Sequence, residues 1–176
     1  GSEMCIRDRD PRNTVTAREA DIHLRLLPGT DGALALGMAQ VMIEEDLYDH
    51  EFVEKYVHGF EEYRAYVKQF TPEYTEKITG VPAEKILEAA RLYATNGPAG
   101  IMFSAATVVH HINGVQNYRA VHTLVGLSGN YDRKGGHLAR PPVSAPVNEF
   151  GKVKRYDGEE AIGQKDFPAW FALPCE

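Results

Sequence analysis

The chain has 176 residues, of which 43% are hydrophobic and 25% are charged, and its formal net charge is -6. This balance is typical of one globular domain, or part of a larger one, and excludes a disordered chain. The negative charge argues against a nucleic-acid backbone as the partner, because such partners favour a basic face. No apolar run approaches the roughly 18 to 20 residues that a membrane-spanning helix needs, so we expect no direct membrane insertion.

The two ends of the chain differ from its middle. Residues 1–9 resemble a translated sequencing adapter, so we leave them out of the predicted fold and expect the strand before Asp10 to be absent or replaced. Cys5 and Cys175 stand at opposite extremes and predict neither a metal site nor a disulfide framework. Between the ends we expect a domain over residues 10–137, followed by an extended tail or linker over residues 138–176, where glycine and proline mark turns.

The predicted elements begin after residue 9. Residues 14–21 can form one or two helical turns, and residues 22–27 alternate apolar and polar side chains as a short strand does. An apolar helix starts at about Ala33, where Thr30 or Asp31 can cap it. Its buried face is predicted to carry Leu34, Met38, Val41 and Met42. Further helices are predicted over residues 50–57, 60–70, 72–78 and 83–94.

The second half of the chain predicts one more strand and one more helix. Residues 100–103 are apolar and follow a glycine–proline stop, which favours a buried strand. Residues 104–113 would then be a loop or strand end, and residues 114–127 a helix. One side of that helix is predicted to carry Val115, Tyr118, Val121 and Leu124. The pieces together predict an α/β fold, a Rossmann-like open sheet with several helices and an irregular C-terminal tail.

Two short polar turns are the most informative feature of the sequence. Residues 10–14, Asp-Pro-Arg-Asn-Thr, and residues 28–31, Pro-Gly-Thr-Asp, each stand where a strand end is expected. In an open α/β sheet, ligands sit at the carboxyl ends of strands, where loop amides and helix N-termini converge. The pattern therefore favours a nucleotide site. The alternative is that Asp31 only caps the following helix and that Asp10 and Pro11 only turn the chain.

A second candidate site is the loop after the predicted strand at residues 100–103, because ligand loops sit between a strand and a helix. This loop contains His110 and His111. His110 could shuttle protons, since imidazole titrates near neutrality. Ordinary polar packing is the more frequent role of such a pair, and at most one of two adjacent histidines faces a given site. A third candidate, the glycine-rich turn at residues 129–136, is explained equally well as an exposed loop.

The order and spacing of these motifs resemble the molybdopterin oxidoreductases of the dimethyl-sulfoxide-reductase type, a family that includes formate dehydrogenases and nitrate reductases. The resemblance runs from Asp10 to about His137, and it is the order of the motifs that makes it specific. The stretches that carry it are Asp10-Pro11-Arg12 with Thr14, Thr16-Ala17 and Ala20-Asp21; Pro28-Gly29-Thr30-Asp31-Gly32-Ala33-Leu34; residues 74–82, ending in Ile78-Thr79-Gly80-Val81-Pro82; and residues 126–136 with Gly129-Asn130.

The resemblance implies a molybdenum or tungsten ion held between two pterin guanine dinucleotides. Both polar turns would then bind the guanosine end of one dinucleotide. An ionised Asp31 can accept two N–H bonds from a guanine edge. Gly29 lets the backbone approach the ligand, and Arg12 can neutralise it or stack on it. The implied cofactor-binding residues are Asp10, Arg12, Thr14, Gly29, Thr30, Asp31 and Ser104, and none of them is a metal ligand.

The loop at residues 104–114 departs from the family pattern. In the family this loop is usually glycine-rich, carries a glutamine, and approaches the pterin and the metal. Here Ser104 and two alanines replace the glycines, and His110 and His111 lie near the glutamine position. The leading interpretation is an oxidoreductase, and the departure also leaves a non-redox hydratase or hydroxyl-transferase of the same cofactor family open. A nucleotide-binding module without metal is a third interpretation.

The resemblance also implies parts that this sequence does not contain. A [4Fe–4S] cluster needs clustered cysteines, so it is expected only in a missing N-terminal part, together with the protein ligand of the metal. The domain that completes the second dinucleotide site should follow Glu176. We therefore expect an internal fragment that is inactive alone. Its implied partners are the missing domains of the same chain, a small-molecule substrate and an iron–sulfur electron-transfer subunit.

Overall fold

The computed structural model describes residues 7–102 and 112–138. Within these two ranges the chain forms seven helices and a two-stranded sheet, so the fold is mixed α and β. The predicted α/β class is confirmed at this level, although the described sheet has two strands rather than the many of an open sheet. The predicted tail over residues 138–176 lies outside the described residues, apart from its first residue.

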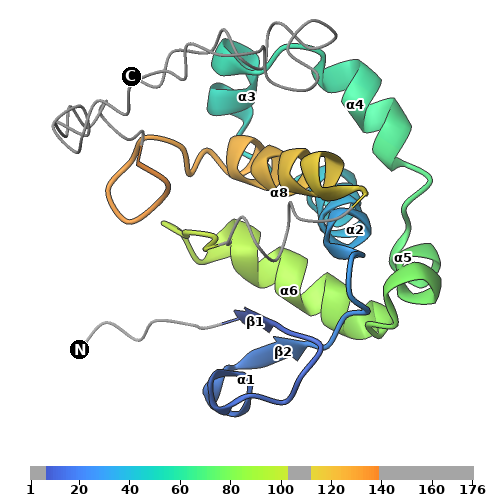
Figure 1. Cartoon of the computed structure of the whole chain (residues 1–176). Helices are drawn as coiled ribbons and strands as arrows, with labels where there is room; N and C mark the ends of the chain where they lie inside the picture. Colours follow the sequence, from blue (N-terminus) through green and yellow to red (C-terminus); the bar gives the residue numbers. More distant parts are fainter. Residues whose placement is uncertain (1–6, 103–111, 139–176) are drawn as a thin grey trace, which may run out of the picture. The chain divides into compact units, whose positions relative to one another are not determined.

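The sheet is a short parallel pair. Strand β1 (Arg7–Arg9) pairs with strand β2 (Ile22–Leu24), and Arg9 stands opposite Leu24 in the register. Helix α1 (Val15–Glu19) lies in the connection between them, which gives the β–α–β order visible in Figure 1. The Thr14 hydroxyl oxygen accepts the N–H of Ala17 at 3.1 Å and caps α1. Because the strands are parallel, their carboxyl ends reach the same edge of the sheet.

Strand β1 corrects the sequence analysis. Residues 7–9 belong to the segment that we excluded as foreign, yet they pair with β2, so a strand does precede Asp10. The sequence hid it because Arg7-Asp8-Arg9 has no apolar residue. A strand is defined by backbone hydrogen bonds, which charged residues make as well as apolar ones do. Whether residues 1–9 are native to the protein stays a prediction.

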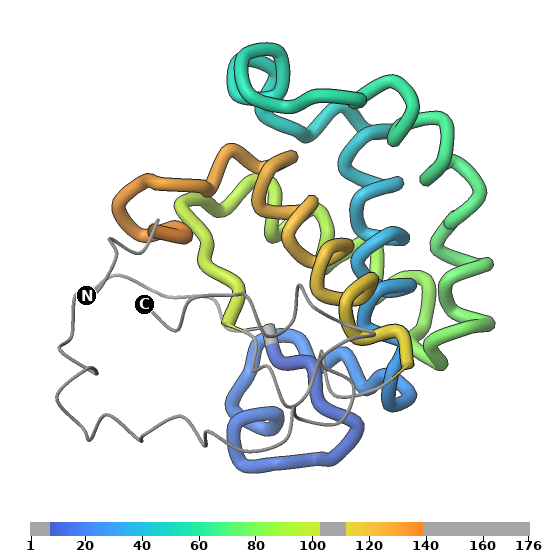
Figure 2. Tube along the Cα trace, turned by 45° about the horizontal axis from the view of Figure 1, so that its top comes forward, coloured from blue at the N-terminus to red at the C-terminus, as the bar shows by residue number. Residues whose placement is uncertain are grey.

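Helix α2 (Asp31–Glu44) is the centre of the helical part, and nine of its 14 residues are buried. The four apolar residues predicted for its buried face are all buried. Its largest contacts are with α8 (Gly114–Leu127), α6 (Ala83–Thr95) and α5 (Pro72–Thr79). Figures 1 and 2 both show α8 running beside α2, with α6 next to the pair. Neighbours on several sides explain why burial on α2 extends beyond one stripe.

The short helices between α2 and α6 begin and end close to their predicted limits. They are α3 (His50–Tyr56), α4 (Phe60–Val67) and α5. The Thr71 hydroxyl oxygen accepts the N–H of Tyr74 at 3.3 Å, and Pro72 occupies the first helical turn, so the predicted start of α5 is confirmed. Gly80 ends α5 with a φ of +74°, a left-handed conformation that favours glycine.

Of the two elements predicted for the second half, the strand is wrong and the helix is confirmed in its limits and in part of its buried face. Gly100–Met102, the described part of the predicted strand, is not assigned to a strand, and Met102 is 97% exposed. Helix α8 has the predicted limits, and Val121 and Leu124 of its predicted face are buried, whereas Val115 is 62% exposed. In the first turns Gly114 and Asn117 are buried instead, and an apolar pattern does not detect a glycine and an asparagine.

The close approach of α2 to α5 gives a first prediction. A Cβ added to Gly37 would lie 2.5 Å from Oγ1 and 2.7 Å from Cγ2 of Thr75, whose stiff side chain is fully buried. We expect Gly37→Ala to lower the free energy of unfolding by about 1–3 kcal/mol through overpacking, as measured by urea unfolding.

Gly126→Ala is the matched control, because no atom lies within 4 Å of a Cβ added to this glycine of α8. There we expect stabilisation of up to about 1 kcal/mol, since alanine is the better helix former. Equal effects of the two substitutions would contradict the close packing of α2 on α5.

Candidate functional site

The two polar turns follow the carboxyl ends of the two parallel strands, β1 and β2. Each turn is bonded to the neighbouring strand at this edge. Arg9 Nη1 at the end of β1 lies 3.2 Å from Asp31 Oδ1 of the second turn. In the first turn, the carbonyl of Asp10 accepts the Nε2–H of His23 at 2.8 Å and the carbonyl of Pro11 accepts the Nε–H of Arg25 at 3.0 Å. The turns are 14 or more residues apart in sequence, so the strand pairing brings them together. Their side chains form one candidate site.

Asp31 is the first residue of α2 and does not act as its cap. Thr30 holds the N-cap position, but its hydroxyl donates to the carbonyl of Leu27 at 2.7 Å instead of capping the helix. The side chains of Asp31 and Arg9 are 15% and 19% exposed, so their ion pair is largely shielded from water. Burial lowers the pKa of Arg9, and the charge of Asp31 opposes that shift. The helix N-terminus further favours the carboxylate.

The first turn is held by bonds within itself. Asp10 Oδ1 accepts the backbone N–H of Arg12 at 2.7 Å and its Nε–H at 3.3 Å. These two hydrogen bonds, the backbone one first, hold the pKa of Asp10 below its usual range. The Arg12 side chain is 80% exposed, and the Thr14 hydroxyl is engaged as the cap of α1. Cofactor binding by these three residues stays a prediction.

Asn117 of α8 holds the second turn in place, and the sequence analysis missed it. Its Nδ2 donates to the carbonyl of Gly29 at 3.0 Å, and its Oδ1 accepts the N–H of Gly32 at 3.2 Å. Gly29 has a φ of +84°, and a Cβ on Gly32 would lie 2.4 Å from Asn117 Oδ1. The available signal was a polar residue in helical register with Gly114, Val121 and Leu124, which are buried with it.

Strand β1 carries one unsatisfied group. Among the described residues, Oδ2 of Asp8 is buried without a hydrogen-bond partner. A buried carboxylate oxygen without a partner is costly, and Arg9 beside it is also largely buried. A charged segment in the place of an apolar strand would show both features. Residues 7–9 nevertheless pair with β2, so whether residues 1–9 are foreign stays a prediction.

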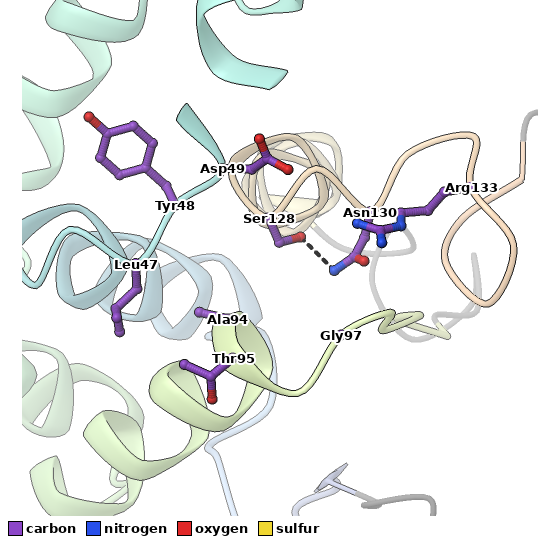
Figure 3. A pocket seen from close by; sticks show the side chains of 9 residues that line it. All are labelled: Leu47, Tyr48, Asp49, Ala94, Thr95, Gly97, Ser128, Asn130 and Arg133. Carbon is purple, nitrogen blue, oxygen red and sulfur yellow. Dashed lines mark hydrogen bonds between the residues drawn. The ribbon is translucent and has the colours of Figure 1, made fainter. Parts of the chain in front are cut away.

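The third candidate, the turn at residues 129–136, begins with two buried residues, Gly129 and Asn130, and is exposed over residues 131–135. Asn130 is 2% exposed, its Oδ1 accepts the N–H of Ala99 at 3.2 Å, and its Nδ2 donates to Ser128 Oγ at 2.9 Å (Figure 3). The turn borders a pocket of about 350 Å³. The pocket is lined by Leu47, Tyr48, Asp49, Ala94, Thr95, Gly97, Ser128, Asn130 and Arg133.

This pocket lies at the other end of α8 from the polar turns. Asn117, which holds the second turn, and Leu127, which ends the helix beside the pocket, are ten residues apart on α8. At the helical rise they are separated by about 15 Å. The pocket is therefore not part of the candidate site formed by the two turns.

Several predicted site residues cannot be placed. Ser104, His110 and His111 lie outside the described residues. In the described ranges, no group of three or more histidine, cysteine, aspartate or glutamate side chains could hold a metal ion. Among the helices that the structure describes, none is both long and apolar enough to cross a membrane.

Residues 7–174 match the family model described as molybdopterin oxidoreductase. The chain belongs to the molybdopterin oxidoreductase family. The predicted resemblance is thereby confirmed, and the relatives that follow agree with the dimethyl-sulfoxide-reductase type.

Two relatives represent the range of similar proteins. Formate dehydrogenase H of Escherichia coli is 42% identical over 142 residues, which are 81% of this chain and 19% of that protein. Acetylene hydratase of Syntrophotalea acetylenica is 42% identical over 156 residues, which are 89% of this chain and 20% of that protein. The chain thus spans about a fifth of the length of the curated relatives it matches.

A solved structure also resembles the chain. Acetylene hydratase from Pelobacter acetylenicus superimposes with a TM-score of 0.69 at 40% identity, over 71% of this chain and 17% of that one. The similarity in sequence and structure supports a common α/β fold.

The position of Asn117 gives a second prediction. We expect Asn117→Ala to lower the free energy of unfolding by about 1–3 kcal/mol, because it leaves the N–H of Gly32 and the carbonyl of Gly29 without their partner. Thermal or urea unfolding measures the change.

Gln116→Ala is the control, since it removes an exposed amide from the same helix. Its effect should stay within about 0.5 kcal/mol. If Asn117→Ala were equally harmless, Asn117 would not hold the second turn.

Proposed function

We propose that this chain supplies the binding surface for the guanosine end of a pterin guanine dinucleotide in a molybdenum or tungsten oxidoreductase. The observation that carries the proposal is the convergence of the two polar turns at the carboxyl edge of parallel strands, with Asp31 at the N-terminus of α2. Membership of the molybdopterin oxidoreductase family supports the class of cofactor.

The residues at this edge fit the guanosine end of such a cofactor. The guanidinium of Arg9 donates an N–H to Asp31, and the Watson–Crick edge of guanine offers donors of the same kind, N1–H and N2–H. Arg9 therefore stands in for a ligand donor, and guanine would have to replace it. Gly29 keeps the adjacent backbone free of a side chain, and Asn117 fixes the turn before the ligand arrives.

The remaining predicted residues would contact the other parts of the dinucleotide. Asp10, Arg12 and Thr14 would reach the ribose or phosphates from the first turn, with Thr30 on the second turn, and Ser104 would approach from its loop. When bound, the cofactor supplies a metal that changes oxidation state during oxygen-atom, sulfur or hydride transfer. The chain itself binds and orients the dinucleotide. We further propose that β1 and β2 belong to a larger, Rossmann-like parallel sheet.

A hydratase or hydroxyl-transferase of the same cofactor family is the second candidate. The similarity to acetylene hydratase over 89% of the chain favours it. Artificial electron donors and acceptors separate the two, because an oxidoreductase requires net electron transfer and a hydratase does not. A small-molecule substrate is proposed in either case. An iron–sulfur electron-transfer subunit and a [4Fe–4S] cluster are proposed for the oxidoreductase, and the cluster would lie outside this chain.

A nucleotide-binding module without metal remains a testable third function. Titration of this chain with GDP distinguishes it from the leading proposal. Tight binding by the chain alone would favour the module, since the leading proposal shares the cofactor between this surface and other domains.

Substitution of Asp31 gives the third prediction. In the longer protein that carries this segment, we expect Asp31→Ala to weaken dinucleotide binding by roughly 10- to 100-fold, because hydrogen bonds to a charged acceptor are lost. Molybdenum and tungsten content of the purified protein, measured by mass spectrometry, should fall accordingly.

Glu88→Gln removes the same negative charge from the exposed surface of α6 and should leave the metal content unchanged. A full metal complement in the Asp31→Ala protein would refute guanosine binding at this turn.

A further inference from the structure

In the segment after α6, two backbone N–H groups donate to side chains. In a sheet, the carbonyl groups of a neighbouring strand would accept such bonds. Ala99 and Ile101 are two residues apart, the spacing at which N–H groups of a strand face the same neighbour. The N–H of Ala99 donates to Oδ1 of Asn130 at 3.2 Å, and the N–H of Ile101 donates to Nε2 of His137 at 2.9 Å. Both acceptors come from the loop at residues 128–138, which we call the clasp loop.

Main-chain bonds hold the two acceptors in one unit. The N–H of His137 donates to the carbonyl of Asn130 at 2.7 Å, and the N–H of Asp132 donates to the carbonyl of His137 at 2.5 Å. Asn130 is itself fixed, because its Nδ2 donates to Ser128 Oγ, which donates in turn to the hydroxyl of Tyr93 on α6 at 3.1 Å. The clasp loop is therefore attached to both α8 and α6 before it contacts Ile101.

The bond from Ile101 fixes the protonation state of His137. A backbone N–H can only donate, so Nε2 must be the acceptor, and the proton of the neutral ring is on Nδ1. A protonated imidazole has no acceptor, and it would place a second N–H against that of Ile101. The bond from Asn130 to Ala99 has no such dependence, because an amide does not titrate in this range.

Within residues 7–102 and 112–138, the ionisable groups near His137 that the structure describes come from α8 and from the clasp loop itself. On α8, the ring of His122 lies 6.2 Å from that of His137 between centroids, and Tyr118 packs against His122. Burial, and then the neighbouring His137, lower the pKa of His122. The clasp loop contributes Asp132, Arg133 and Lys134, and residues 96–102 carry no ionisable side chain.

We propose that Asn130 and His137 form a two-point clasp that positions residues 99–101, and that protonation of His137 opens one of its two points. His137 is a positioning residue, since it acts through Ile101. The clasp does not depend on the proposed function.

Amide hydrogen exchange of the 176-residue chain, followed by NMR, tests the clasp without any cofactor. In the wild type we expect the protection factor of Ile101 to fall roughly 5- to 10-fold between pH 7.5 and pH 5, the net worth of one hydrogen bond. The protection factor of Ala99 serves as the internal reference and should not change. His58→Gln, which replaces an exposed histidine on another part of the surface, should behave as the wild type does.

Two variants separate a specific acceptor from a merely structural residue. In His137→Gln the amide oxygen can accept the same N–H, so Ile101 should stay protected at both pH values. In His137→Leu, Ile101 should be unprotected at both. Protection of Ile101 that is independent of pH in the wild type, or pH-dependent in His137→Gln, would overturn the proposal. If His137→Leu does not fold, the wild type and the glutamine variant still decide.

Discussion

The contact between Gly32 and Asn117 is the constraint on which the rest of the structure depends. A helix normally keeps its neighbours at the distance of a side chain, but Gly32 has none, so Asn117 of α8 reaches the backbone of α2 directly. That one amide satisfies the N–H of Gly32 and the carbonyl of Gly29. It thereby fixes the packing of α8 on α2 and the conformation of the turn that ends in Asp31.

Helix α8 connects this contact with the clasp loop, which follows the other end of the helix. Its first turns hold the polar turn after β2, and the clasp loop that follows its last residue holds Ala99 and Ile101. One helix thus connects the turn after β2 with the segment after α6. Burial of Val121, Leu124 and Leu127 against the core keeps α8 in place.

The sequence predicts what local chemistry determines. Caps, prolines and left-handed glycines lie next to the helix ends that they define, so the limits of α5 and α8 and the burial of α2 could be derived from residues alone. Strand β1 could not, because its pairing with β2 depends on the backbone and its side chains are charged. The importance of Asn117 could not either, since its partners are 85 and 88 residues away in the chain.

The two turns of the candidate site differ in how far they are prepared for a ligand. In the first turn, Asp10 and Arg12 satisfy each other and Thr14 caps α1, so a ligand must break local bonds before it can use these groups. In the second turn, Asn117 already orders the backbone, and the carboxyl group of Asp31 already holds one N–H donor, the guanidinium of Arg9. Because the backbone of the second turn is already ordered, a ligand that binds there does not have to order it, and the binding free energy is not reduced by that entropy cost. We therefore expect recognition of the base by the second turn to contribute more to affinity than contacts of the first turn to ribose and phosphate.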